Sequence, residues 1–255
     1  MIRSSVIKKG TWLASFMLAV CLCAHAEVKL PAIFSDGMVM QQQTKANLWG
    51  TATPNKKITV TTGWNGKQYV ATADKNGAWK LSVSTPEAGG PYSITFNDGS
   101  KKTLNNILIG ELWLCSGQSN MEMPMKGFKN QPVENANMDI LRSKNPNIRL
   151  FTVKRTSTFT PQTDVVGTWK EATPANVRDF SATAYYFGRL INEILDVPVG
   201  LVVAAWGGSA CEAWMTADWL KAFPDAKIPQ SEADIKSKNR TPTVLYNGKI
   251  GRAHV

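Results

Sequence analysis

The sequence is poor in the side chains that most often bind metal ions. Only two histidines, His25 and His254, occur in 255 residues, and the four cysteines form no Cys-x-x-Cys pair. Structural and catalytic zinc sites are built largely from these two residue types. The composition therefore argues against a metalloenzyme, and we expect neither a metal ion nor a cofactor.

Long apolar runs are also scarce. The one candidate, Trp12–Cys23, is too short to span a membrane comfortably. It follows a positively charged stretch and precedes Ala24-His25-Ala26, a small-x-small cleavage site. We therefore predict a signal peptide over residues 1–26, a periplasmic or secreted location, and no stable membrane span after cleavage. A lipoprotein signal at Cys21 or Cys23 is the alternative, but the residues before these cysteines disfavour it.

Acidic residues are fewer than basic ones, and the formal net charge is +10. The bases are scattered along the chain, which favours a solvated surface over a dedicated site for anionic sugars. No nucleic-acid-binding motif occurs, so we expect no nucleic-acid partner.

Two cysteines, Cys115 and Cys211, remain after the predicted cleavage. In an exported protein they can pair as a disulfide or remain two buried small apolar side chains. The sequence leaves both possibilities open and favours the second.

Residues 27–105 have the composition of a β-rich leader domain. Short runs rich in valine, isoleucine, threonine and aromatics alternate with turn signals such as Asn65-Gly66 and Asn76-Gly77, which favour tight hairpins. The expected strands are Ala46–Ala52, Lys57–Thr62, Gln68–Ala73, Ala78–Val83 and Tyr92–Phe96. This rhythm predicts a small β-sandwich-like leader. Its tryptophans, Trp49, Trp64 and Trp79, either bind carbohydrate or fill a thin core, and we prefer the core.

The pattern changes after Asn106 to that of an α/β domain. Ile107–Ser116 and Ile148–Val153 are expected to be strands. Apolar residues between Phe180 and Leu195 recur at helical spacing, and Val199–Trp206 is apolar without alternation. A strand buried on both faces has that composition, as in a parallel sheet.

Two of these strands end in glycine-bearing turns. Gly117-Gln118-Ser119-Asn120 follows the first, and Gly207-Gly208-Ser209 follows Val199–Trp206. In open α/β sheets the crevice beyond the carboxyl ends of the strands binds ligands. A serine on a sharp turn after a buried strand is where hydrolases place a nucleophile, with backbone N–H groups close by to bind an oxyanion. We therefore place Ser119 and the two glycines at one site.

The residues around these turns resemble the sialate O-acetylesterases of the SGNH hydrolase superfamily. The similarity lies in Leu112–Met123, in Trp206–Met215 and in the opening segment Leu30–Gln41, and it extends from Val28 to about Gly248. It implies a flavodoxin-like three-layer α/β hydrolase domain preceded by the β-sandwich-like leader. The implied substrate is an O-acetylated sialic acid or another acetylated glycan.

The resemblance also implies roles for individual residues. Ser119 matches the nucleophile, and its own N–H is one oxyanion donor. Gly207 or Gly208 matches a second donor, and the sequence does not decide between them. Asn120 is expected to brace the turn.

The chain departs from the family pattern toward its end. The Gln-Gly-Glu-type segment and the catalytic Asp and His of the family do not occur after Thr241–Gly248. Residues 250–255 match the translation of a common sequencing adapter, so we expect a non-native tail there, and residues 106–249 to be the N-terminal part of the esterase domain. On this hypothesis the chain is a fragment with little activity. The alternative is a non-catalytic secreted sugar-binding protein.

Overall fold

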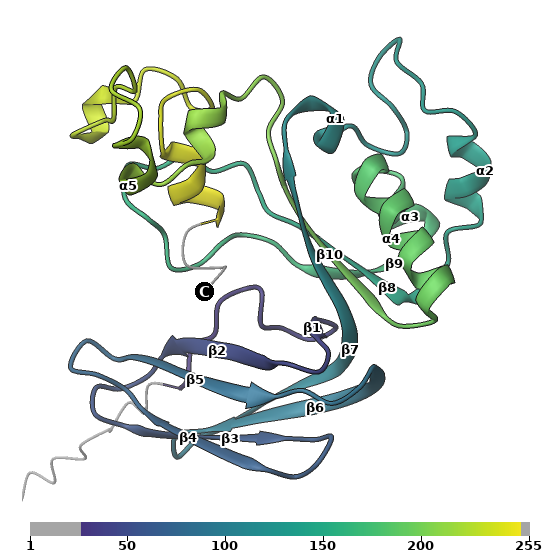
Figure 1. The fold of residues 1–255 in the computed structure, drawn as a ribbon. Coiled ribbons are helices and arrows are strands. Elements are labelled where there is room, and N and C mark those ends of the chain that lie inside the picture. The colour runs from purple at the N-terminus through teal and green to yellow at the C-terminus, as the bar shows by residue number, and fades with distance from the viewer. Residues whose placement is uncertain (1–26, 251–255) are drawn as a thin grey trace, which may run out of the picture.

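The computed structural model describes residues 27–250, with only the backbone of Ile250. The predicted signal peptide and all of the predicted tail beyond Ile250 lie outside the described residues. Figure 1 shows the two parts of the molecule, a β-rich leader and an α/β part, joined by one long strand. Among the described residues no helix is long and apolar enough to cross a membrane.

The leader consists of two packed layers of β-structure. Its strands are β1 (Val39–Gln41), β2 (Lys45–Thr51), β3 (Lys57–Thr62), β4 (Gln68–Thr72), β5 (Ala78–Ser84) and β6 (Gly89–Asn97). The antiparallel β2–β5 ribbon lies over the sheet formed by β4, β3, β6 and the following strand. Alternating side chains such as Ile58, Val60, Ile94 and Phe96 are fully buried between the layers. The predicted sandwich-like leader is confirmed.

Strand β7 (Lys101–Gly117) is the element that both parts share. Its first half pairs with β6, and with β1 from Leu108 to Gly110. Its second half, from Glu111 to Gly117, pairs in parallel with β10 (Val199–Ala205). The position at which the sequence predicts the leader to end, residue 105, therefore falls inside this strand.

The α/β part is a sheet between two layers of helical structure. β10 lies between β7 and β8 (Asn145–Thr152), parallel to both, and β9 (Trp169–Ala172) adds an antiparallel edge. Figure 1 shows this sheet between the helices α2, α3 and α4 on one side and the segment that contains α5 on the other. The short elements of these layers are α1 (Ser119–Glu122), α2 (Ala136–Leu141), α3 (Pro174–Val177), η1 (Cys211–Trp214), α5 (Ala217–Leu220), η2 (Glu232–Asp234) and η3 (Tyr246–Ile250). The predicted α/β class is confirmed, and the layers of helical structure on both faces of the sheet agree with the expected flavodoxin-like arrangement.

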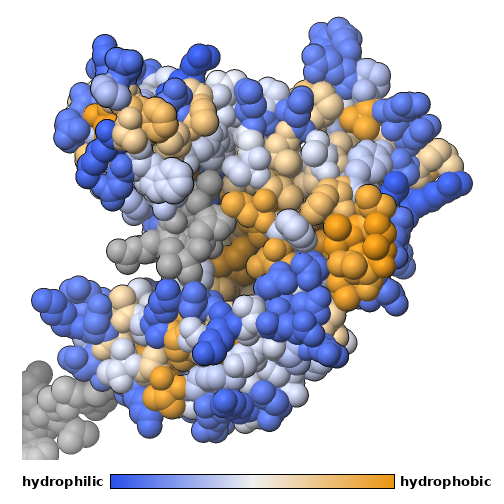
Figure 2. All heavy atoms as spheres, in the orientation of Figure 1, coloured by the Kyte–Doolittle hydropathy of each residue, from blue (hydrophilic) through white to orange (hydrophobic). Residues whose placement is uncertain are grey.

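Helix α4 (Ala182–Leu195) covers β10 with only part of its apolar surface. Ala184, Tyr185 and Gly188 are buried, and a Cβ added to Gly188 would lie 2.6 Å from Leu201 Cδ1, so the helix sits close to the sheet. The sequence periodicity grouped Leu190 and Ile194 with this face, but they are 52% and 68% exposed. Figure 2 shows apolar surface in this region, where α4 and the adjoining part of β7 lie. Helical spacing alone does not decide which apolar side chains face the sheet.

Arg149 on β8 ties the leader to the α/β part. Its guanidinium donates to the carbonyl oxygens of Pro146 and Gly37 and to Asn106 Oδ1, at 2.7, 3.3 and 3.0 Å. Its side chain is 4% exposed and also lies 3.4 Å from a carboxylate oxygen of Glu171. A buried cation with this many acceptors joins three chain segments that are far apart in the sequence.

Lys249 in η3 is a second buried cation, with fewer partners. Its Nζ donates to the carbonyl oxygen of Ala205 at 2.7 Å and lies near the rings of Trp206 and Trp214. The residue is 2% exposed. Burial lowers the pKa of Lys249 to about 8, although the negative charge of Glu122 acts in the other direction.

We expect Arg149→Ala to destabilise the protein. Hydrogen bonds to a charged group contribute about 1.5–3 kcal/mol each, so the free energy of unfolding should fall by roughly 3 kcal/mol or more in urea titrations. Arg142→Ala is the matched control, because Arg142 is exposed and its side chain makes no hydrogen bond within the described residues. Equal stability of the two variants would contradict this role for Arg149.

We expect Lys249→Met to stabilise the protein. The pKa of this lysine falls from 10.5 to about 8 on folding, which corresponds to a cost on the order of 3 kcal/mol at neutral pH. Below pH 8 both states are protonated and the cost is complete. Between pH 8 and 10.5 only the unfolded state keeps the proton, so the stability of the parent protein should rise with pH. The gain from Lys249→Met, measured by urea unfolding at pH 7 and 10, should shrink accordingly, and a constant difference would refute the assignment.

Candidate active site

Ser119 stands at the point where β7 gives way to α1. Gly117, the last residue of β7, has a φ of +155°. A Cβ there would also lie 3.2 Å from Met121 Cβ, so glycine allows the chain to turn sharply. Ser119 begins the single turn α1 and is exposed. The structure therefore places Ser119 on a tight turn after an apolar strand, as the sequence pattern predicts.

The second glycine turn lies directly beside the serine. Ala205 is in register with Gly117, and because the strands are parallel their carboxyl ends meet at one edge of the sheet. Trp206 N–H then donates to the carbonyl of Gly117 at 3.1 Å. A Cβ added to Gly207 would lie 3.3 Å from Ser119 Oγ. The structure thus brings Ser119 and the glycine turn together.

The other two predicted site residues flank this contact. Gly208 is exposed and has a φ of +70°, which glycine adopts without strain. Asn120 accepts a hydrogen bond from Thr183 Oγ1 through its main-chain oxygen at 3.0 Å, so α4 holds the turn. The Asn120 side chain is exposed and makes no hydrogen bond within the described residues. The chemical roles of all four residues stay predictions.

Sequence reasoning missed the ion pair that connects the two turns. Glu122 Oε2 accepts the N–H of Gly207 at 2.7 Å, and Arg155 contacts both carboxylate oxygens at 2.7 Å. Burial would raise the pKa of Glu122, but hydrogen bonds from Arg155 and Gly207 together hold it below its usual value. The sequence could have predicted that Glu122 lies near the site, because it follows Ser119 by three residues, about one helical turn. Arg155 follows β8 and carries no comparable sequence signal.

The cysteines near the site are not paired. Cys115 is buried, Cys211 is exposed, and both are free thiols. Burial raises the pKa of Cys115 to about 11, so its thiol stays protonated at neutral pH. Cys115 therefore packs as a buried small apolar side chain, as favoured from the sequence, but the expectation that Cys211 is buried as well is wrong.

The described residues lack two kinds of chemical group. No histidine occurs between residues 27 and 250. In the same part of the chain no three His, Cys, Asp or Glu side chains are grouped so that they could hold a metal ion.

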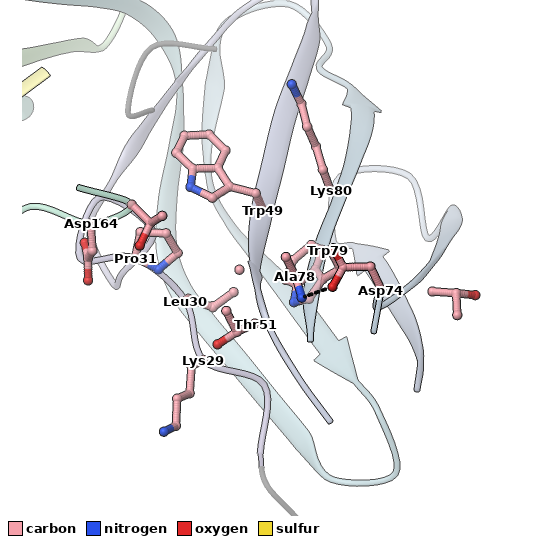
Figure 3. A pocket seen from close by; sticks show the side chains of 13 residues that line it. Lys29, Leu30, Pro31, Trp49, Thr51, Asp74, Ala78, Trp79, Lys80 and Asp164 are labelled. Carbon is pink, nitrogen blue, oxygen red and sulfur yellow. Dashed lines mark hydrogen bonds between the residues drawn. The ribbon is translucent and has the colours of Figure 1, made fainter. Parts of the chain in front are cut away.

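A cavity of about 670 Å³ lies between the leader and the segment that contains Thr163 and Asp164, apart from Ser119 and the glycine turn. Figure 3 shows Trp49, Asp74, Trp79, Lys80 and Asp164 among the residues around it. Trp79 is 3% exposed and belongs to the leader core, as preferred from the sequence. Trp49 is only half-buried and stacks edge-on against Phe34, with ring centroids 4.5 Å apart. This cavity is separate from the candidate active site.

Comparison with known proteins identifies relatives over most of the chain. Residues 109–246 match the family model described as carbohydrate esterase, sialic acid-specific acetylesterase. The sialate O-acetylesterases of Pongo abelii and Homo sapiens are each 28% identical over 243 residues, covering 87% of this chain and 45% of their own length. The chain thus spans about half the length of the curated relatives it matches.

A solved structure supports the same assignment. A carbohydrate acetylesterase from Xanthomonas citri aligns with a TM-score of 0.77 at 33% identity, covering 88% of this chain and 48% of that protein. The matched family segment includes Ser119, both glycines, Glu122 and Arg155. The chain belongs to the carbohydrate esterase family of sialic acid-specific acetylesterases.

Proposed function

We propose that this protein removes O-acetyl groups from sialic acids or related acetylated sugars by a serine acyl-enzyme mechanism. The observation that carries the proposal is the approach of Gly207 to Ser119, which puts backbone N–H groups and an exposed hydroxyl at the ends of two parallel strands. The family assignment supports a carbohydrate ester as substrate. The predicted signal peptide favours a periplasmic or secreted location.

The proposed reaction has two acyl-transfer steps. Ser119 Oγ loses its proton and attacks the acetyl carbonyl carbon, and the carbonyl oxygen becomes an oxyanion. The N–H of Ser119 and one glycine N–H stabilise that charge. The C–O bond to the sugar then breaks, and the sugar oxygen takes up a proton. Water attacks the acetyl-serine in the same way, so acetate leaves and Ser119 regains its hydrogen.

The described residues do not supply every group that this reaction needs. A serine hydroxyl needs a general base, which is most often a histidine. Because residues 27–250 contain no histidine, we infer that this part of the chain alone hydrolyses esters slowly. An external base such as imidazole should partly replace the missing group.

We expect Ser119→Ala to abolish the hydrolysis that imidazole stimulates. Loss of a nucleophile costs about 10⁴-fold or more in rate when the rest of the machinery is present, and less where the base is external. Release of acetate from an O-acetylated sialoside, measured with and without imidazole, tests this.

Ser116→Ala is the matched control for that experiment. Ser116 lies three residues earlier in β7, and its Oγ donates to the carbonyl of Ala204 at 3.1 Å, away from the glycine turn. The Ser116→Ala variant should keep most of the rate of hydrolysis that imidazole stimulates. Equal rates for the Ser119 variant and the parent protein would exclude Ser119 as the nucleophile.

A second candidate function is non-catalytic binding of sugars, and the cavity beside Trp49 favours it. Trp49 presents a half-buried ring, and Asp74, Lys80 and Asp164 add polar groups around it. Aromatic faces beside polar groups are typical of ligand pockets. If this hypothesis holds, Trp49→Ala weakens binding of a sialylated glycan at least about 10-fold by calorimetry, which corresponds to 1.4 kcal/mol.

Trp64→Ala is the control for the cavity. Trp64 is also half-buried, but its Nε1 donates to the carbonyl of Ser84, and it does not line the cavity. Under the esterase hypothesis neither substitution changes glycan binding. A loss confined to the Trp49 variant would favour the binding function.

A further inference from the structure

We propose that Gly208, and not Gly207, provides the glycine N–H of the oxyanion hole, and that Glu122 and Asn239 are the positioning residues that aim it. The inference rests on the proposed serine mechanism and decides a point that the sequence leaves open. Its basis is the hydrogen bonding of the turn after β10.

Both backbone groups of Gly207 are already occupied. Its N–H donates to Glu122 Oε2 at 2.7 Å, and its carbonyl accepts from Asn239 Nδ2 at 3.0 Å. An N–H bound to a carboxylate at this distance is a charge-assisted hydrogen bond, stronger than a bond between neutral groups. Turning it toward a substrate oxygen would break that bond during the reaction, whereas an oxyanion hole works because its donors are already in place.

The next two N–H groups of the turn differ from each other. Ser209 N–H donates to the carbonyl of Trp206 at 3.3 Å. Gly208 N–H has no hydrogen-bond partner within residues 27–250. Of three consecutive donors, only the one on Gly208 is therefore free to bind a developing negative charge.

Asn239 sets the direction of that free donor. The carbonyl of Gly207 and the N–H of Gly208 belong to one planar trans peptide unit, in which the two groups point in opposite directions. Because Asn239 holds the carbonyl, the N–H of Gly208 is turned away from Asn239 and cannot rotate independently. The left-handed φ of +70° at Gly208 keeps this arrangement free of side-chain strain.

Glu122 joins this peptide to the nucleophile. It lies three residues after Ser119 in the same helical turn, so the serine and the acceptor for Gly207 share one backbone segment. Arg155 holds both oxygens of the carboxylate, and its guanidinium also lies 5.5 Å from the ring of Trp206, the residue before Gly207. The serine and the glycine turn are thus held together as one unit.

Amide hydrogen exchange measured by NMR on the ¹⁵N-labelled full chain tests the hydrogen bonding. Gly207 N–H should exchange slowly and Gly208 N–H fast. Glu122→Ala should speed exchange at Gly207 at least about 10-fold, the change expected when an opening costs 1.4 kcal/mol less. Glu122→Gln keeps an oxygen acceptor and should restore most of the protection, and the exposed Glu134→Ala should change nothing.

A covalent probe tests the role in binding the oxyanion. A fluorophosphonate places a phosphonyl oxygen in the oxyanion position when Ser119 Oγ displaces fluoride, and the serine proton passes to solvent or imidazole. In the adduct, the amide proton of Gly208 should move downfield and that of Gly207 should stay in place. In Asn239→Ala the Gly208 shift should shrink and labelling should slow by about 10-fold or more.

The outcomes separate this inference from the proposed function. A Ser119 adduct that shifts the Gly207 amide instead overturns the assignment of Gly208 and leaves the serine nucleophile standing. Full labelling speed and an unchanged Gly208 shift in Asn239→Ala remove the positioning role. Absence of any Ser119 adduct by mass spectrometry, with imidazole present, overturns the proposed function and this inference with it.

Discussion

Strand β7 is the constraint on which the rest of the structure depends. Its first half belongs to the leader sheet through β6 and β1, and its second half belongs to the α/β sheet through β10. A strand that pairs on both halves cannot shift its register without turning every buried side chain outward. It ends at Gly117, two residues before Ser119, so the position of the candidate nucleophile is set by hydrogen bonding that begins in the leader.

The leader therefore contributes to the site without supplying any of its chemical groups. Arg149 strengthens this link, because it binds Gly37 in the leader and Asn106 in β7 from its place on β8. Beyond the end of β7, a smaller network of hydrogen bonds fixes the glycine turn relative to Ser119. Glu122 and Asn239 bind the two backbone groups of Gly207, and Arg155 holds the carboxylate of Glu122, so the glycine turn is fixed against α1. Rigid support of this kind is what a preorganised oxyanion hole requires.

The family assignment and the geometry support different parts of the functional proposal. Membership in the sialic acid-specific acetylesterases supports the class of substrate and the hydrolytic reaction. The contact between Ser119 and Gly207 supports the choice of nucleophile. The general base is supported by neither within residues 27–250, where no histidine occurs. The chain spans about half of the length of its curated relatives, so the activity of the whole protein is proposed here from the half that the chain shares with them.

The sequence by itself predicted most of the longer strands, helix α4 and the two turns at which the candidate site lies. Alternation and hairpin signals predicted the leader strands, and the unbroken apolar run at Val199–Trp206 predicted a strand of a parallel sheet, because these patterns depend on neighbours close in the chain. Only the tertiary structure decided which apolar residues of α4 face β10, that Arg155 binds the carboxylate of Glu122, and that Glu122 and Asn239 meet at Gly207. Those contacts join residues 33, 85 and 32 positions apart, and only the packing of the sheet sets their geometry.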